Sequence, residues 1–171
     1  MPALKTARLA KFATRSAKLD VAPAAPTPDF IDPSELPDRY AMIVQGVCLE
    51  PEIKDGDCLM FDKTVPYKAG DLVILFKRPE RVQPGRLPAI VKRLVMAPPP
   101  WVKFPHVEHP NSDVHALLIA EQFNPKGSFA IPCADLLAVH KCLGPVPAEM
   151  KCVPTTEAAA RAMNRAKLRK A

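Results

Sequence analysis

The chain has 171 residues, of which 48% are hydrophobic, and its formal net charge at pH 7 is +6. This length fits one domain with its own core plus appended segments, and it argues against a second full domain. No apolar run approaches the ~20 residues that cross a bilayer, and the N-terminus has no signal-peptide core, so we expect a cytoplasmic protein with no membrane association.

Basic residues concentrate near both ends of the chain. The first 20 residues carry five basic side chains and one acidic one, and residues 149–171 carry six basic and two acidic ones. Residues 1–37 are predicted to be a basic N-terminal segment that ends in a proline-rich linker. Residues 147–171 are predicted to be a basic tail, with a helix beginning at Thr155 or Thr156. These tails could contact an anionic partner such as nucleic acid, or they could be flexible solvating ends.

Residues 38–146 are predicted to form one mainly β domain. Apolar runs of strand character occur at 40–46, 58–62, 71–78, 89–96, 115–125 and 134–146. Gly56 and Gly70 stand in the turns between the early strands, where a positive φ favours glycine. We therefore expect an antiparallel β fold built from short strands and tight turns.

The long loop over 97–114 is rich in proline and contains Trp101 and Phe104. Large aromatic side chains are mostly buried, so we expect both to cover the edge of the core. A binding surface is the alternative role for this loop.

The five cysteines include no CxxC pair. An odd number of cysteines without a secretory signal indicates reduced thiols rather than a disulfide framework. Four of them are expected to be structural: Cys58, Cys133, Cys142 and Cys152.

A metal site is the alternative use of the cysteines and histidines. His106 and His109 are three residues apart, and His115 and His140 follow. This segment lacks the helix or knuckle that presents zinc ligands, so we expect no metal and no cofactor.

The most distinctive segment is IVQGVCLEPEIKDGD, residues 43–57. It places Cys48 at a tight turn ahead of an acidic β-turn, and Lys92 interrupts the later apolar run AIVKRLV. Together these segments resemble the core of the LexA and UmuD self-cleaving peptidases and of the related type I signal peptidases. The matching residues are Gly46, Glu50, Pro51, Asp55, Gly56, Asp57, Lys92 and Arg93. Val47, Cys48 and Leu49 depart from the pattern, and Cys48 stands where the family has its nucleophilic serine.

The resemblance implies a LexA/signal-peptidase-like, barrel-like antiparallel β fold and a homodimer. It also implies that Cys48 is the nucleophile, that Lys92 is the general base or ion-pair partner, and that the substrate is a peptide or the chain's own linker. An exposed thiol and amine would favour thiolate and ammonium, whereas burial would favour the neutral pair. Either state can attack a carbonyl.

A retired active site is the alternative to a peptidase. The family cleaves Ala-Gly or Cys-Gly upstream of the nucleophile, and neither dipeptide occurs in this chain, although Ala24-Ala25 offers small residues. Cys48 could then be a buried, inert core residue. The domain would serve as a regulatory module that binds a peptide, a nucleic acid or a second copy of itself.

Overall fold

The computed structural model describes residues 30–107 and 115–147, together with residues 150, 161, 164, 165 and 168. Most of the predicted N-terminal segment, His109, Cys152 and the predicted helix start at Thr155 or Thr156 lie outside the described residues. The predicted domain boundaries therefore stay predictions.

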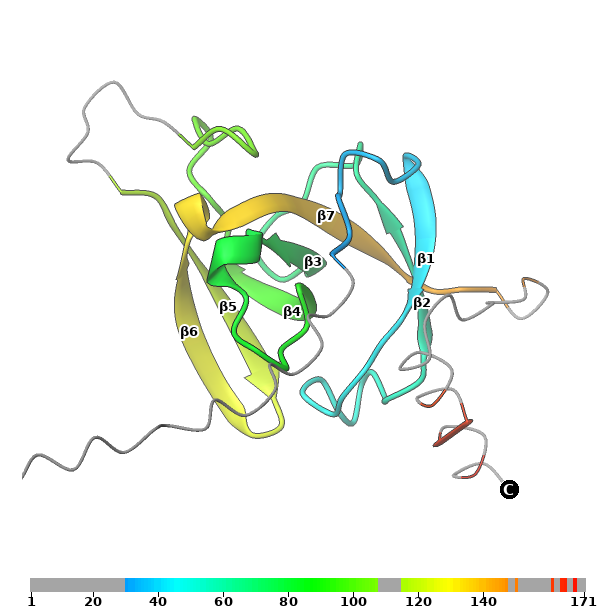
Figure 1. The fold of residues 1–171 in the computed structure, drawn as a ribbon. Coiled ribbons are helices and arrows are strands. Elements are labelled where there is room, and N and C mark those ends of the chain that lie inside the picture. Colours follow the sequence, from blue (N-terminus) through cyan, green and yellow to red (C-terminus); the bar gives the residue numbers. More distant parts are fainter. Residues whose placement is uncertain are drawn as a thin grey trace, which may run out of the picture.

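The described chain is mainly antiparallel β, as the sequence predicts, and forms one sheet of seven strands. The strands are β1 (Arg39–Ile43), β2 (Cys58–Asp62), β3 (Leu72–Lys77), β4 (Ala89–Met96), β5 (Leu117–Phe123), β6 (Lys126–Pro132) and β7 (Leu136–Pro145) (Figure 1). Two short 3-10 helices, η1 (Pro79–Arg81) and η2 (Cys133–Asp135), precede β4 and β7. No helix in the described residues combines the length and apolar character required to span a membrane.

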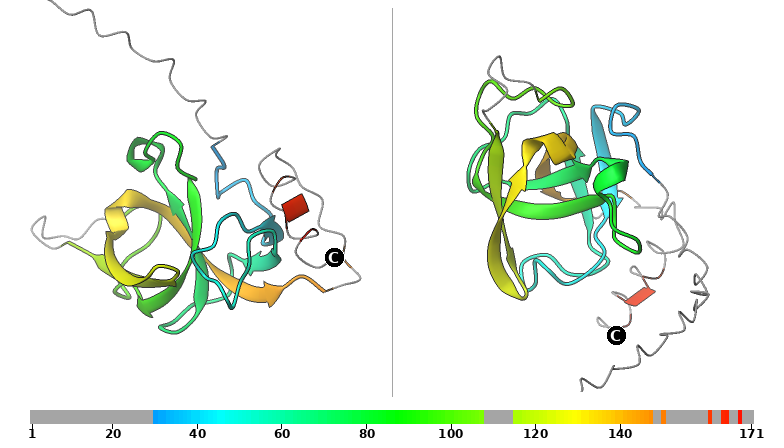
Figure 2. Two further views of the ribbon diagram at one scale, coloured as in Figure 1. Left: turned by 90° about the horizontal axis from the view of Figure 1, so that it is seen from below. Right: turned by 60° about the vertical axis from the view of Figure 1, so that its left-hand side comes forward.

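The sheet order is β1-β2-β7-β3-β4-β5-β6, so β1 and β6 are its two edges. The last strand, β7, holds the sheet together, because its first half pairs with β3 and its second half pairs with β2. Figures 1 and 2 show β7 crossing from the group formed by β3 to β6 to the pair formed by β1 and β2. The sheet therefore curves strongly around its longest strand.

Two buried clusters form the core on opposite faces of the central strands. Val73 and Leu75 belong to the first cluster, whereas Ile74 and Phe76 belong to the second, because successive side chains of β3 point to opposite faces. Residues 97–107 of the long loop pack against the first cluster through partly buried side chains that include Trp101 and Phe104. Their predicted role in covering the core is confirmed.

The sequence predicts most of the strands but misses one. The bounds of β2 and β4 agree with the prediction, and β1, β3, β5 and β7 are one to three residues shorter at one or both ends. No strand was predicted for β6, because Gly127 and Pro132 disfavour strand structure. Pairing of Phe123 with Lys126 instead forms a tight β5–β6 hairpin at Asn124-Pro125.

The prediction that all the thiols are reduced is wrong, because the structure contains a disulfide. Cys58, at the start of β2, is disulfide-bonded, whereas Cys48, Cys133 and Cys142 are free. An odd number of cysteines does not exclude a single pair, and spacing along the sequence does not reveal which thiols meet in space.

Candidate functional site

The segment between β1 and β2, residues 44–57, is referred to here as the Cys48 loop. Backbone hydrogen bonds close it at its base, from Val44 N to Asp57 O and from Gly56 N to Val44 O, both 2.8 Å long. Gly46 and Gly56 have positive φ values of 97° and 89°, which a side chain would oppose. Asp57 accepts a hydrogen bond from Lys54 N at 2.8 Å, which confirms its predicted role in the turn.

The Cys48 loop is attached to the β5–β6 hairpin through the backbone of Cys48 itself. The carbonyl of Cys48 accepts hydrogen bonds from Phe123 N at 2.8 Å and from Asn124 N at 3.1 Å. The backbone N–H of Cys48 has no hydrogen-bond partner within the described residues.

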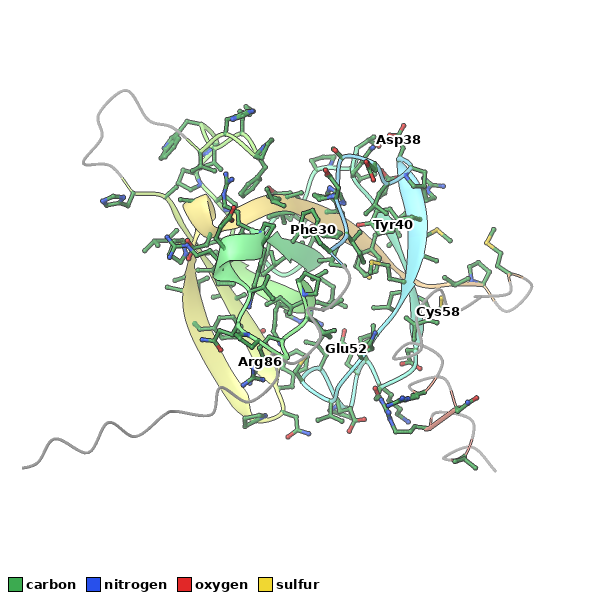
Figure 3. All side chains as sticks on the ribbon, in the orientation of Figure 1. Phe30, Asp38, Tyr40, Glu52, Cys58 and Arg86 are labelled. Carbon is green, nitrogen blue, oxygen red and sulfur yellow. The ribbon has the colours of Figure 1, made fainter. Side chains whose placement is uncertain are left out.

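Arg93 forms a second attachment between the loop and the sheet. Its guanidinium binds both carboxylate oxygens of Glu52 and donates to Gly70 O at 2.9 Å. It also lies over the ring of Phe123, 5.4 Å from the ring centre. Glu52, labelled in Figure 3, lies in the Cys48 loop between β1 and β2. A single terminal nitrogen of Arg93 contacts both Glu52 oxygens and the other donates to Gly70 O, so this one side chain links the loop to the turn before β3.

The Cys48 thiol is half-buried and packs against the second core cluster. Its Sγ donates to the carbonyl of Val91 on β4, at 4.0 Å. This contact brings the thiol to the strand that carries Lys92, at the residue immediately before it.

Lys92 is a buried lysine whose partners in the described chain are an amide and an aromatic ring. Its side chain extends from β4, and the residue is only 6% exposed. Nζ donates to Gln122 Oε1 at 3.2 Å and lies 5.9 Å from the centre of the Phe129 ring. No acidic side chain in the described residues forms an ion pair with it. Lys92 also acts on Lys77 on β3: the pKa of Lys77 is lowered mainly by burial and further by electrostatic repulsion from Lys92.

Cys48 and Lys92 reach the same short stretch of β4 but have separate hydrogen-bond partners. Val91 packs in the second core cluster with Cys48, whereas Phe129, beside Lys92, packs in the first. Val91 and Lys92 are neighbours on β4 and point to opposite faces of the sheet. This explains why Cys48, near Val91, and Lys92 have different surroundings. Within the described part of the chain no direct hydrogen bond joins Sγ to Nζ. A direct dyad contact stays a prediction.

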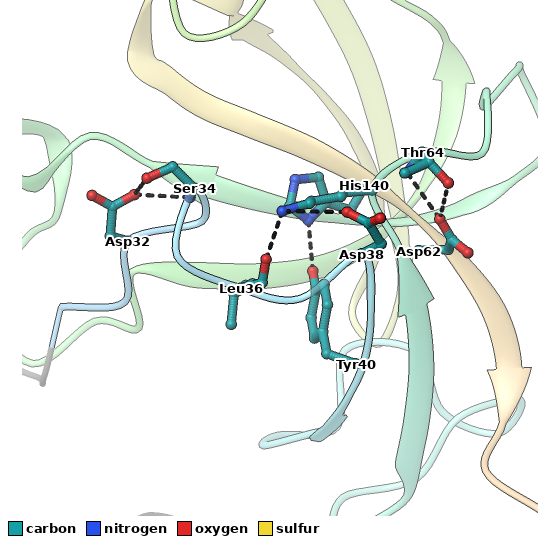
Figure 4. Close-up of polar contacts among 9 residues, drawn as sticks. Asp32, Ser34, Leu36, Asp38, Tyr40, Asp62, Thr64 and His140 are labelled. Carbon is teal, nitrogen blue, oxygen red and sulfur yellow. Dashed lines mark hydrogen bonds and ion pairs between the residues drawn. The ribbon is translucent and has the colours of Figure 1, made fainter.

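A second polar group lies between β1, β2 and β7 (Figure 4). Tyr40 Oη is 2.7 Å from His140 Nδ1, and Thr64 donates to Asp62 through its hydroxyl at 2.6 Å and its backbone N–H at 2.9 Å. In the described residues, none of these groups forms a hydrogen bond or ion pair with Cys48 or Lys92. Among the described residues, no set of three or more His, Cys, Asp or Glu side chains is placed to hold a metal ion.

The sequence did not identify Gln122 as part of the site. The available signal was a polar residue in the apolar run of β5, but its contact with Lys92 depends on the β4–β5 pairing.

The chain was compared with known protein families, with curated proteins and with solved structures, and none of the three comparisons finds a match. Its function is therefore argued from its own residues and geometry.

Proposed function

We propose that this chain is a LexA/UmuD-like peptidase-fold protein in which Cys48 and Lys92 form a Cys–Lys site for peptide-bond hydrolysis. One observation carries the proposal: the Cys48 thiol contacts the backbone of β4 beside Lys92, a buried lysine with no carboxylate partner in the described residues. Burying a lysine amine without a carboxylate partner destabilises a fold, so its presence in this strand favours a functional role. The curved antiparallel sheet is compatible with the barrel-like fold of this family, and a homodimer stays a prediction.

The proposed reaction has two halves. In the first, Sγ forms a bond to the scissile carbonyl carbon, and the thiol proton passes to a neutral Lys92 amine, or the thiolate of an ion pair attacks without a transfer. The C–N bond then breaks, and Lys92 gives a proton to the leaving amine. In the second half, water gives a proton to Lys92 and attacks the thioester, which releases the acid and the Cys48 thiol. The backbone N–H of Cys48 would bind the oxyanion in both halves.

A catalytically retired module is the second candidate. The observation in its favour is that Sγ and Nζ bind different partners, Val91 O and Gln122 Oε1. In that case the domain would bind an extended peptide without cleaving it, as edge strands such as β6 can do.

Thiol alkylation distinguishes the two candidates. Cys48 is expected to react with iodoacetamide faster than Cys133 and Cys142, because the thiolate is the reacting species and burial raises the pKa of Cys142 and raises that of Cys133 to about 11. Replacing Lys92 with Ala should slow the labelling of Cys48 several-fold at neutral pH. The rates are measured by mass spectrometry across pH.

The control is Lys103→Ala, which removes an exposed lysine of the loop that follows β4. Labelling of Cys48 that is as slow as that of Cys133, or that is unchanged in Lys92→Ala, would leave the retired module as the function. A synthetic peptide of residues 20–30, which contains Ala24-Ala25, tests hydrolysis directly, with Cys48→Ala as the blank.

A further inference from the structure

The Cys48 loop binds an arginine from a distant part of the chain. Arg165 donates from Nε to Asp55 Oδ2 at 2.6 Å and from a terminal nitrogen to Asp55 Oδ1 at 3.1 Å. Arg165 is in α-helical conformation, as are Arg161, Asn164 and Leu168. Figure 1 shows these residues in red beside the lower end of β2. The pair therefore joins the C-terminal segment to the loop between β1 and β2.

The geometry of Asp55 makes this contact more than a surface ion pair. Asp55 is only 3% exposed, and its Oδ1 also accepts a hydrogen bond from Gly46 N at 2.9 Å. One carboxylate thus contacts both Arg165 and the backbone two residues before Cys48. Such bidentate, charge-assisted hydrogen bonds are stronger and more directional than neutral ones. A buried carboxylate without a partner destabilises the fold, so the Asp55 site favours a guanidinium partner such as that of Arg165.

We infer that Arg165 is a latch: by pairing with the buried Asp55 carboxylate it restrains the backbone of the Cys48 loop from Gly46 to Cys48. Arg165 is thereby a positioning residue for Cys48 and does not itself take part in the chemistry. The consequence for catalysis rests on the proposed function, whereas the restraint of the loop does not. Release of Arg165 would let the loop open and expose the half-buried thiol.

The latch is tested in the full-length chain with Arg165→Ala, Asp55→Asn and the double variant. Asparagine retains an oxygen for the Gly46 N–H but loses the charge that binds Arg165, so it separates the two roles of Asp55. Both single variants should speed hydrogen exchange at the Gly46 amide and iodoacetamide labelling of Cys48, by about three- to tenfold. The double variant should be no faster than either single variant, and Arg165→Lys should fall between wild type and Arg165→Ala.

Two control variants are used: one changes a residue next to Arg165, and the other removes an arginine elsewhere. Asn164→Ala alters the neighbouring residue of the same helical segment, and Arg86→Ala removes an exposed arginine in the β3–β4 connection, labelled in Figure 3. Neither should change the rates. If Arg165→Ala leaves both rates unchanged, the latch is wrong. The latch is also wrong if exchange becomes faster in Asp55→Asn but not in Arg165→Ala. An unreactive Cys48 in all variants, with faster Gly46 exchange in Arg165→Ala, would refute the proposed hydrolase while leaving the latch intact.

Discussion

His140 is a buried base whose protonation opposes folding. It lies on β7, is 7% exposed, and has its Nδ1 2.7 Å from the Tyr40 hydroxyl. Burial, assisted by the positive charge of Lys63, lowers its pKa from 6.5 to about 4, although Asp62 acts in the opposite direction. The unfolded chain therefore binds more protons than the folded one between these two pH values. The free energy of unfolding should fall as pH falls through this window.

The variant His140→Gln should lose this pH dependence. In the wild type the slope from this residue should approach, and not exceed, about 1.4 kcal/mol per pH unit, the value for one proton. Urea unfolding at several pH values between about 4.5 and about 7 measures it, with the variant as reference. Equal slopes in the two proteins would show that His140 is protonated in the folded state as readily as in the unfolded one.

Adjacent lysine and arginine residues on β4 have different roles. Arg93 pairs with Glu52, which lies in the Cys48 loop, and its position over Phe123 adds a cation–π contact. Lys92 instead faces a neutral amide and an aromatic ring. Arginine suits the first position because its guanidinium has several donors, which here reach both Glu52 and Gly70 O, whereas lysine is the residue that can exchange a proton. Lys92 is thus the candidate reactive residue, and the adjacent Arg93 holds the Cys48 loop.

At the scale of elements, β5 is a strand with one buried face and one exposed face. Leu118 is fully buried in the first core cluster, whereas its neighbour Leu117 is 41% exposed. Leu118→Ala should lower the free energy of unfolding by about 2–5 kcal/mol, because it removes buried methyl groups and leaves a cavity. Leu117→Ala should change it by no more than about 1 kcal/mol. Equal effects in chemical denaturation would contradict the alternation of β5 between core and solvent.

The elements that the sequence predicts are those that carry a local pattern. The apolar runs of β2 and β4 and the glycines of the turns are visible in a short window, and so is Lys92 as an interruption. The edge strand β6 has no such pattern, because its Gly and Pro residues are typical of loops. The contacts of Cys48 with Val91 and of Asp55 with Arg165 join residues that are distant in sequence. Only the folded arrangement reveals them.

At the scale of the whole molecule, the charge distribution connects the C-terminal segment with the candidate site. Residues 149–171 carry six basic side chains, and one of them, Arg165, binds the loop that holds Cys48. A polyanion that bound the other basic residues would act on the part of the chain that carries Arg165. Nucleic-acid binding through the tails stays a prediction, and its strong salt dependence would identify it.

Self-cleavage is the activity on which this chain is expected to differ from the LexA and UmuD peptidases. It contains no Ala-Gly or Cys-Gly dipeptide, and its thiol and amine have separate hydrogen-bond partners. The purified protein should therefore remain full length through long incubation at alkaline pH, where a lysine amine is most readily neutral. Intact mass spectrometry over the incubation measures this.

The serine variant separates chemistry from geometry. Cys48→Ser restores the nucleophile of the resembling family, so a fragment that forms only in this variant would show that the site can assemble and that the thiol prevented the cut. If wild type instead yields a fragment beginning within residues 20–38, and Cys48→Ala abolishes it, the expectation of an intact chain is wrong. The linker would then be the substrate, and Cys48 would have to leave the Val91 carbonyl to reach it, a movement that Arg165→Ala should accelerate.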